Sequence, residues 1–134
     1  MHAMNQMRFD TPEPAIIEQK AHEALARLPE AFRPHLTDIV IRVEEFADAE
    51  TLAEMNIANP WQLVGLYRGH PVNRQSVWAS GDLPPTVYLY RQPLLLRQQQ
   101  TGATLDAVVN HLVVHEVRHH FGLSDADMHA LEDM

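Results

Sequence analysis

The residues best placed to do chemistry lie near the end of the chain, in the stretch Val113 to Asp125, which reads VVHEVRHHFGLSD. It contains His115, Glu116 and His119 in the order HExxH. Residues four apart on a helix lie one above the other, so both imidazoles can reach one metal ion while Glu116 points to the adjoining face. Zinc lowers the pKa of a bound water to about 7, and a nearby glutamate can take a proton from that water. The spacing therefore predicts a hydrolytic zinc site with Glu116 as general base.

A third protein ligand is needed, and Asp125 is the favoured candidate. Gly122 lets the chain turn sharply after the helix, so a residue six positions beyond His119 can return to the metal. The sequence has no cysteine, so any metal must be held by His, Asp or Glu. The alternative role for Asp125 is a helix-capping carboxylate, and Asp127 and His129 are weaker candidates for the third ligand.

Histidine is frequent in this chain, with nine in 134 residues, so a structural role for the motif histidines stays open. In that alternative they are hydrogen-bonded core residues or exposed residues. Burying His115, Glu116 and His119 in an apolar helix would be costly without a partner, and a metal supplies one. His111, one turn before His115, is expected either to support the site or to be solvated. His120 points away from His115, and we expect it to take no part in metal binding.

The motif is predicted to lie on a buried helix over Thr104 to Phe121. Thr104 suits the N-cap position. Apolar residues cover most of the circumference, as is typical of a helix inside a core: Leu105, Val108, Val109, Leu112, Val113, Val114, Val117 and Phe121. Gly122 suits the left-handed residue that ends a helix, and Ser124 can begin a last helix over Asp125 to Asp133.

The rest of the chain predicts short strands and helices that together give an α+β fold. After a flexible lead-in over residues 1–9, apolar spacing predicts a helix from Asp10 or Thr11 to Leu28. Further helical segments are expected over 30–36 and 48–56, and strands over 38–44, 63–67 and 86–91. Residues 72–85 are expected to form a long loop. The periodicity of residues 94–100 does not distinguish between a short helix and a mobile arm.

Composition limits the class of protein and its partners. A chain of 134 residues with 46% hydrophobic residues predicts a single domain, here over residues 10–134. A net charge of -8 argues against nucleic acid and anionic membranes as partners, and favours a neutral or positively charged substrate. The sequence shows no signal peptide or membrane span, so we expect a cytoplasmic, soluble protein. A protease in that compartment would need a restricted active site.

Three stretches of the chain resemble a known family, the small bacterial minimal zincins, which are zinc metallopeptidases with HExxHxxGxxD or a serine in the last place. These stretches are LVGLYRGHPV at Leu63 to Val72, PPTVYLYRQPL at Pro84 to Leu94, and the motif VVHEVRHHFGLSD. The resemblance extends from about Leu28 onward, and its last piece is the most specific.

The resemblance implies a compact zincin-like α+β domain, in which a small mixed sheet of three to four strands packs against the HExxH helix. It implies Zn²⁺ as cofactor, with His115, His119 and Asp125 as ligands and Glu116 as base. Larger metalloproteases with an HxxGxxH extension have a histidine where this chain has Asp125. Their metal affinity is therefore not transferred to this chain.

These inferences lead to a zinc-dependent metallopeptidase that acts on a peptide or protein substrate. Tyr67, Tyr88, Tyr90 and Arg91 are candidates to stabilise the oxyanion, although each is also explained as strand packing or a solvated charge. The strand 86–91 is our prediction for the sheet edge that pairs with the substrate. Two rival functions remain, a non-catalytic zinc-binding or interaction domain and a hydrolase of a small amide. The sequence does not give the oligomeric state.

Overall fold

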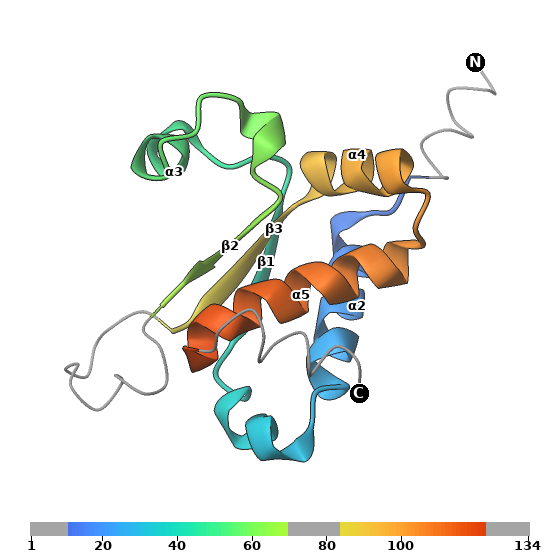
Figure 1. Cartoon of the computed structure of the whole chain (residues 1–134), viewed down its shortest axis with the longest axis vertical. Helices are drawn as coiled ribbons and strands as arrows, with labels where there is room; N and C mark the ends of the chain where they lie inside the picture. The colour runs from blue at the N-terminus through green and yellow to red at the C-terminus, as the bar shows by residue number, and fades with distance from the viewer. Residues whose placement is uncertain (1–10, 70–83, 123–134) are drawn as a thin grey trace.

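The computed structural model describes residues 11–69 and 84–122 and has an α+β architecture (Figure 1). Its sheet has three strands in the order β1-β3-β2, which are β1 (Val40–Glu44), β3 (Thr86–Tyr90) and β2 (Gly65–Arg68). β1 is parallel to β3, and β2 is antiparallel to it. The predicted fold class, with a small mixed sheet, is confirmed.

Helices surround this sheet and connect its strands. Residues 11–69 and 84–122 contain four α-helices, α2 (Pro14–Ala26), α3 (Ala49–Glu54), α4 (Arg91–Thr101) and α5 (Leu105–Phe121). They also contain two short 3-10 segments, η1 (Glu30–His35) and η2 (Pro60–Gln62). Thr104 caps α5 as predicted, because its hydroxyl accepts a hydrogen bond of 3.1 Å from the backbone N–H of Ala107. Gly122 ends α5 in the left-handed conformation, with φ 66°.

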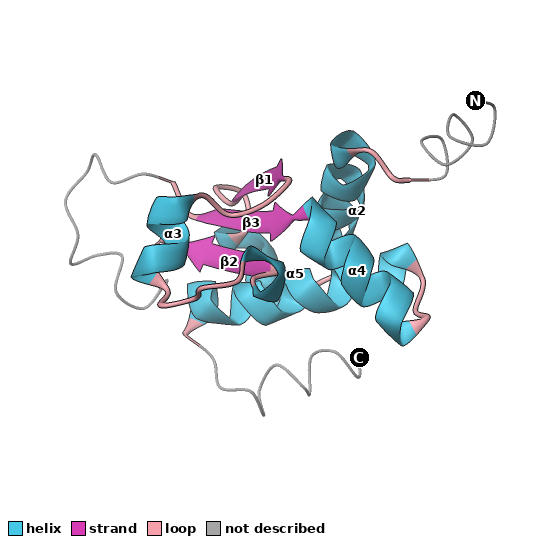
Figure 2. Ribbon diagram, turned by 90° about the horizontal axis from the view of Figure 1, so that it is seen from above, coloured by secondary structure: helices cyan, strands magenta, loops and turns pink. Residues whose placement is uncertain are grey.

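One face of the sheet carries the main hydrophobic core. Ile41, Val87 and Tyr67 lie side by side across the three strands, and their side chains point to this face. The sheet packs there against α2 and α5, which also pack on each other (Figure 2). The helices contribute buried apolar residues to the core: Ile17, Ala21, Ala24, Val109, Val113 and Val117. This core fixes the motif helix against the sheet.

The opposite face of the sheet is covered by a smaller cluster. Tyr88 and Tyr90 alternate with the core residues of β3 and so point to this face, where their rings stack with centroids 6.3 Å apart. They pack with Leu66 of β2 and with apolar residues of the connection that contains α3 and η2: Ala47, Leu52, Ile57 and Leu63. These tyrosines are therefore separated from α5 by the sheet.

The sheet order corrects one prediction from the sequence. The strand 86–91 was expected at an edge, but β3 is the central strand and is paired on both sides. Its pattern of buried residues explains the position, since four of its five residues are buried. The edges of the described sheet are β1 and β2.

The other elements agree closely with the sequence pattern. Residues 94–100, which periodicity left open, belong to α4, and Pro93 lies in its first turn, where proline is tolerated. β2 begins two residues later than predicted, at Gly65. The lead-in 1–9, most of the loop 72–85 and the last helix 125–133 lie outside the described residues. In the described part of the chain, no helix combines the length and apolar character needed to cross a membrane.

β2 and α5 approach each other closely at Gly65. A Cβ atom added there would lie 3.3 Å from the Tyr88 carbonyl oxygen and 3.5 Å from Oε2 of Glu116. A methyl group nearly fits this space, whereas a branched side chain does not. The glycine thus lets the carboxyl group of Glu116 sit directly against the strand.

We predict that Gly65→Val lowers the free energy of unfolding by about 1–3 kcal/mol, because the added methyl groups overpack the space between β2 and α5. Gly65→Ala should cost clearly less, since its single methyl meets only one tight contact. Urea denaturation of both variants checks this. If both variants lost the same free energy of unfolding, the backbone freedom of glycine, and not the close approach of Glu116, would explain why position 65 is a glycine.

Candidate metal centre

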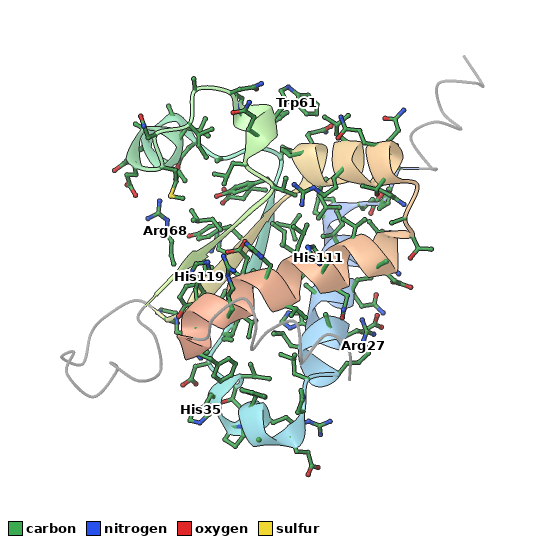
Figure 3. All side chains as sticks on the ribbon, in the orientation of Figure 1. Arg27, His35, Trp61, Arg68, His111 and His119 are labelled. Atoms are coloured by element: carbon green, nitrogen blue, oxygen red, sulfur yellow. The ribbon has the colours of Figure 1, made fainter. Side chains whose placement is uncertain are left out.

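The helix α5 presents a stripe of histidines to solvent. His111, His115 and His119 are exposed and follow one another at four-residue spacing. Adjacent ring centroids are 6.3 Å apart for both the His111–His115 and the His115–His119 pair. Figure 3 shows His111 near the middle of α5 and His119 toward its carboxyl end, where the helix meets β2. The expected cost of burying the motif therefore applies to Glu116 and not to the two imidazoles.

The environment of the motif histidines keeps them in the form that binds metal. Partial burial, followed by the charge of Arg118, lowers the pKa of His115. The same two causes lower the pKa of His119. Both imidazoles are therefore neutral at pH 7, with a lone pair available on the ring, which is the state that metal coordination requires.

Glu116 differs sharply from its neighbours because it points inward. Only 7% of the residue is exposed, and burial raises the pKa of its carboxyl group to about 7. The charge of Arg118 and a hydrogen bond from the backbone N–H of Tyr67 act in the opposite direction on this pKa and are outweighed. A carboxyl group with a pKa near neutrality can both accept and return a proton.

A chain of hydrogen bonds fixes the carboxyl end of α5. Nε2 of His120 lies 2.8 Å from the carbonyl oxygen of His35, and Nδ1 lies 2.9 Å from the hydroxyl of Tyr67. A carbonyl only accepts, so Nε2 carries the proton of His120 and Nδ1 accepts a bond from the tyrosine. His120 is 1% exposed, and it joins α5 to both η1 and β2. Both of its ring nitrogens are thus bonded to groups other than His115 and His119.

Among the four oxyanion candidates, Tyr67 is the one beside the motif. Its ring is nearly parallel to that of His119, at 9° with centroids 6.4 Å apart. Its hydroxyl, however, is occupied by His120, and burial raises the pKa of Tyr67 to about 12. Arg91 instead binds Glu45 and the carbonyl of Pro12. Tyr88 and Tyr90 lie on the opposite face of the sheet.

The residue types present fit part of a zinc site. Two neutral imidazoles one helical turn apart suit two of the four positions of a tetrahedral zinc site. Within residues 11–69 and 84–122, no group of three or more potential ligands is close enough to hold a metal. Asp125, the predicted third ligand, lies outside the described residues, as do the alternatives Asp127 and His129. The third ligand therefore stays a prediction.

Two structural residues of this region carried no sequence signal that identified them. Gly65 was assigned to a strand without a special role, and His120 was expected only to point away from the metal. The partners of His120 are 53 and 85 residues away in the sequence, so local periodicity could not reveal them.

The burial of Glu116 makes stability depend on pH in the metal-free protein. The pKa rises from 4.5 to about 7 on folding, so between these values the unfolded chain loses its proton first and the folded state is progressively destabilised. Above pH 7 the cost is on the order of 3 kcal/mol. Glu116→Gln should remove it, raising the stability of the chelator-treated protein at pH 8 but hardly at pH 4.5.

Urea denaturation at the two pH values checks this prediction. Glu23→Gln, on an exposed position of α2, is the matched control and should change stability little at either pH. A gain for Glu116→Gln that is the same at both pH values would show that the carboxylate is not the source of the cost.

Comparison with known proteins identifies the family of this chain. A family model described as zincin-like metallopeptidase matches residues 36–134. The match includes all three strands and α5, whereas α2 precedes it. No curated protein sequence matches the chain. Because the matched region covers most of the chain, including the HExxH helix and the sheet on which it packs, this protein belongs to the zincin-like metallopeptidase family.

Proposed function

We propose that this protein is a zinc-dependent peptidase in which Glu116 is the general base and His115, His119 and Asp125 hold the metal. The observation that carries this proposal is the contrast within one helical turn of α5. Two exposed, neutral imidazoles flank a buried carboxyl group whose pKa is raised to about 7. A purely structural helix has no need for a buried carboxylate at this position.

Each residue has a distinct task in this mechanism. When bound, zinc supplies a Lewis acid that polarises the scissile carbonyl and acidifies a water. Glu116 takes the proton of the attacking water and passes it to the departing amine nitrogen. Its hydrogen bond from the backbone of Tyr67 holds the carboxylate against β2. Burial of the carboxyl group keeps its proton affinity high enough for this transfer.

The edge strand β2 is the surface that we propose for binding an extended peptide. In the antiparallel pair, the backbone N–H of Tyr90 bonds to the carbonyl of Val64 at 2.9 Å, and Leu66 faces Tyr88. Alternation then directs the N–H and carbonyl of Gly65 and the carbonyl of Tyr67 away from β3, toward the outer edge. The N–H of Tyr67 is bonded to Glu116. A peptide added at this edge would run past Glu116 and the exposed histidines.

We predict that Glu116→Gln retains zinc and loses hydrolysis of peptides by at least about 100-fold, because the metal ligands are intact and the base is removed. Zinc content after dialysis and turnover of a peptide mixture are the two measurements, with Glu23→Gln as control. Unchanged turnover would show that Glu116 is not the general base. Bound zinc without peptide turnover in the wild-type protein would favour the non-catalytic domain or a small-amide substrate.

We predict that Asp125→Ala weakens zinc binding by at least about 100-fold, more than the loss expected from removing a group that only orients a ligand. Competition with a chromogenic chelator measures the affinity. Asp127→Ala is the matched control and should bind zinc like the wild-type protein. The reverse result, with Asp127→Ala impaired and Asp125→Ala intact, would assign the third ligand to Asp127.

A further inference from the structure

A small cavity lies between α4 and α5 on the same side of α5 as the histidine stripe. Its volume is about 170 Å³, and its lining comes from Arg97, Thr101, Ala103, Ala107, Val108 and His111. A cavity of about 150 Å³ is large enough to hold benzene, so this one can take one apolar side chain such as leucine. It is too small for a larger organic ligand, which usually needs at least about 300 Å³.

The cavity lies next to His115, one of the two histidines proposed to bind the metal. His111 forms part of its wall and lies next to His115, with ring centroids 6.3 Å apart. Four residues of helix rise about 6 Å, and an extended peptide advances about 3.3 Å per residue. The wall of the cavity at His111 is therefore about two substrate residues from His115, and the cavity itself lies a few residues from a scissile bond at the proposed metal ligands.

The direction of β2 indicates which end of a substrate reaches the cavity. Gly65 lies against Glu116, and Tyr67 lies against His119, so β2 and α5 run in the same direction here. A peptide that pairs antiparallel with β2, the more stable arrangement, runs from Tyr67 toward Gly65. It continues toward the earlier turns of α5, where Ala107 and His111 line the cavity. Its carboxyl-terminal side thus arrives at the cavity.

Arg97 gives the cavity a positive charge at its rim. The residue is exposed, and it makes no ion pair with any acidic side chain of the described segments. Arg97 lines the same cavity as His111, whose ring lies beside that of His115. A guanidinium is well suited to bind a carboxylate through two parallel hydrogen bonds. Although the net charge of the chain is -8, this part of its surface favours an anion.

We propose that this cavity recognises the carboxyl terminus of the substrate, with an apolar terminal side chain in the cavity and the terminal carboxylate on Arg97. The inference rests on the proposed peptidase function and specifies its substrate as the carboxyl-terminal end of a peptide. Hydrolysis adds hydroxide to the acyl carbon and a proton to the amine nitrogen, and it releases a short carboxyl-terminal fragment. A peptide whose carboxyl terminus is blocked as an amide would lack this contact, whatever its net charge.

Binding to the zinc-loaded full chain with Glu116→Gln tests the proposal without depending on turnover. The probes are acetyl-Ala-Ala-Leu with a terminal carboxylate, its amide, and acetyl-Ala-Ala-Gly, and calorimetry gives the affinities. We expect the leucine acid to bind about tenfold more tightly than the amide and about tenfold more tightly than the glycine acid. Equal affinities for all three would overturn the proposal.

Two further substitutions separate the two contacts. Arg97→Gln should abolish the preference for the acid over the amide and keep the preference for leucine. Ala107→Leu, which fills the cavity from an exposed position of α5, should abolish the preference for leucine. Ala15→Leu, on an exposed position of α2, is the matched control and should change neither. Loss of both preferences in the control would contradict the assignment to the cavity.

The same peptides given to the wild-type protein distinguish failure of this inference from failure of the peptidase function. Binding preferences without cleavage of any peptide would support the carboxylate site and contradict the proposed peptidase function. Cleavage of blocked and unblocked peptides at equal rates would support the peptidase function and contradict the carboxylate site.

Discussion

The burial of one carboxyl group, that of Glu116, is the constraint on which the rest of this structure depends. A carboxylate in an apolar environment is unfavourable, and here burial raises its pKa to about 7. The fold accommodates it through two features of β2, the missing side chain of Gly65 and the backbone N–H of Tyr67. The strand and the helix are therefore matched to each other around a buried carboxyl group whose ionisation destabilises the metal-free protein.

The helical period of α5 divides the motif between two environments. Val113 and Val117 point into the core together with Glu116, whereas His115 and His119 face solvent. The helix is held in this rotation by the main core and, at its carboxyl end, by the bonds of His120 to η1 and β2. A small rotation of α5 would move the carboxyl group away from β2 and the imidazoles toward the core. Rigid packing at both ends of the helix thus sets the geometry of the candidate site.

Local patterns in the sequence predicted most of the elements and the motif. The HExxH spacing, the cap at Thr104 and the left-handed Gly122 depend on residues close in sequence, and the structure confirms the helix that they define. Contacts between distant segments were not predictable in this way. The central position of β3 follows from strand pairing, and the chain Tyr67–His120–His35 follows from tertiary packing. Periodicity also predicted an apolar helix without indicating that its histidines face outward.

X-ray absorption spectroscopy of the zinc-loaded full chain measures directly whether His115 and His119 bind zinc. We expect one zinc ion with two imidazole nitrogens and oxygen ligands at about 2.0–2.2 Å. The imidazole scattering should disappear when His115 and His119 are both replaced by alanine. A zinc shell made only of oxygen, or an imidazole signal that survives this double substitution, would show that the exposed histidine pair beside Glu116 is not the metal centre.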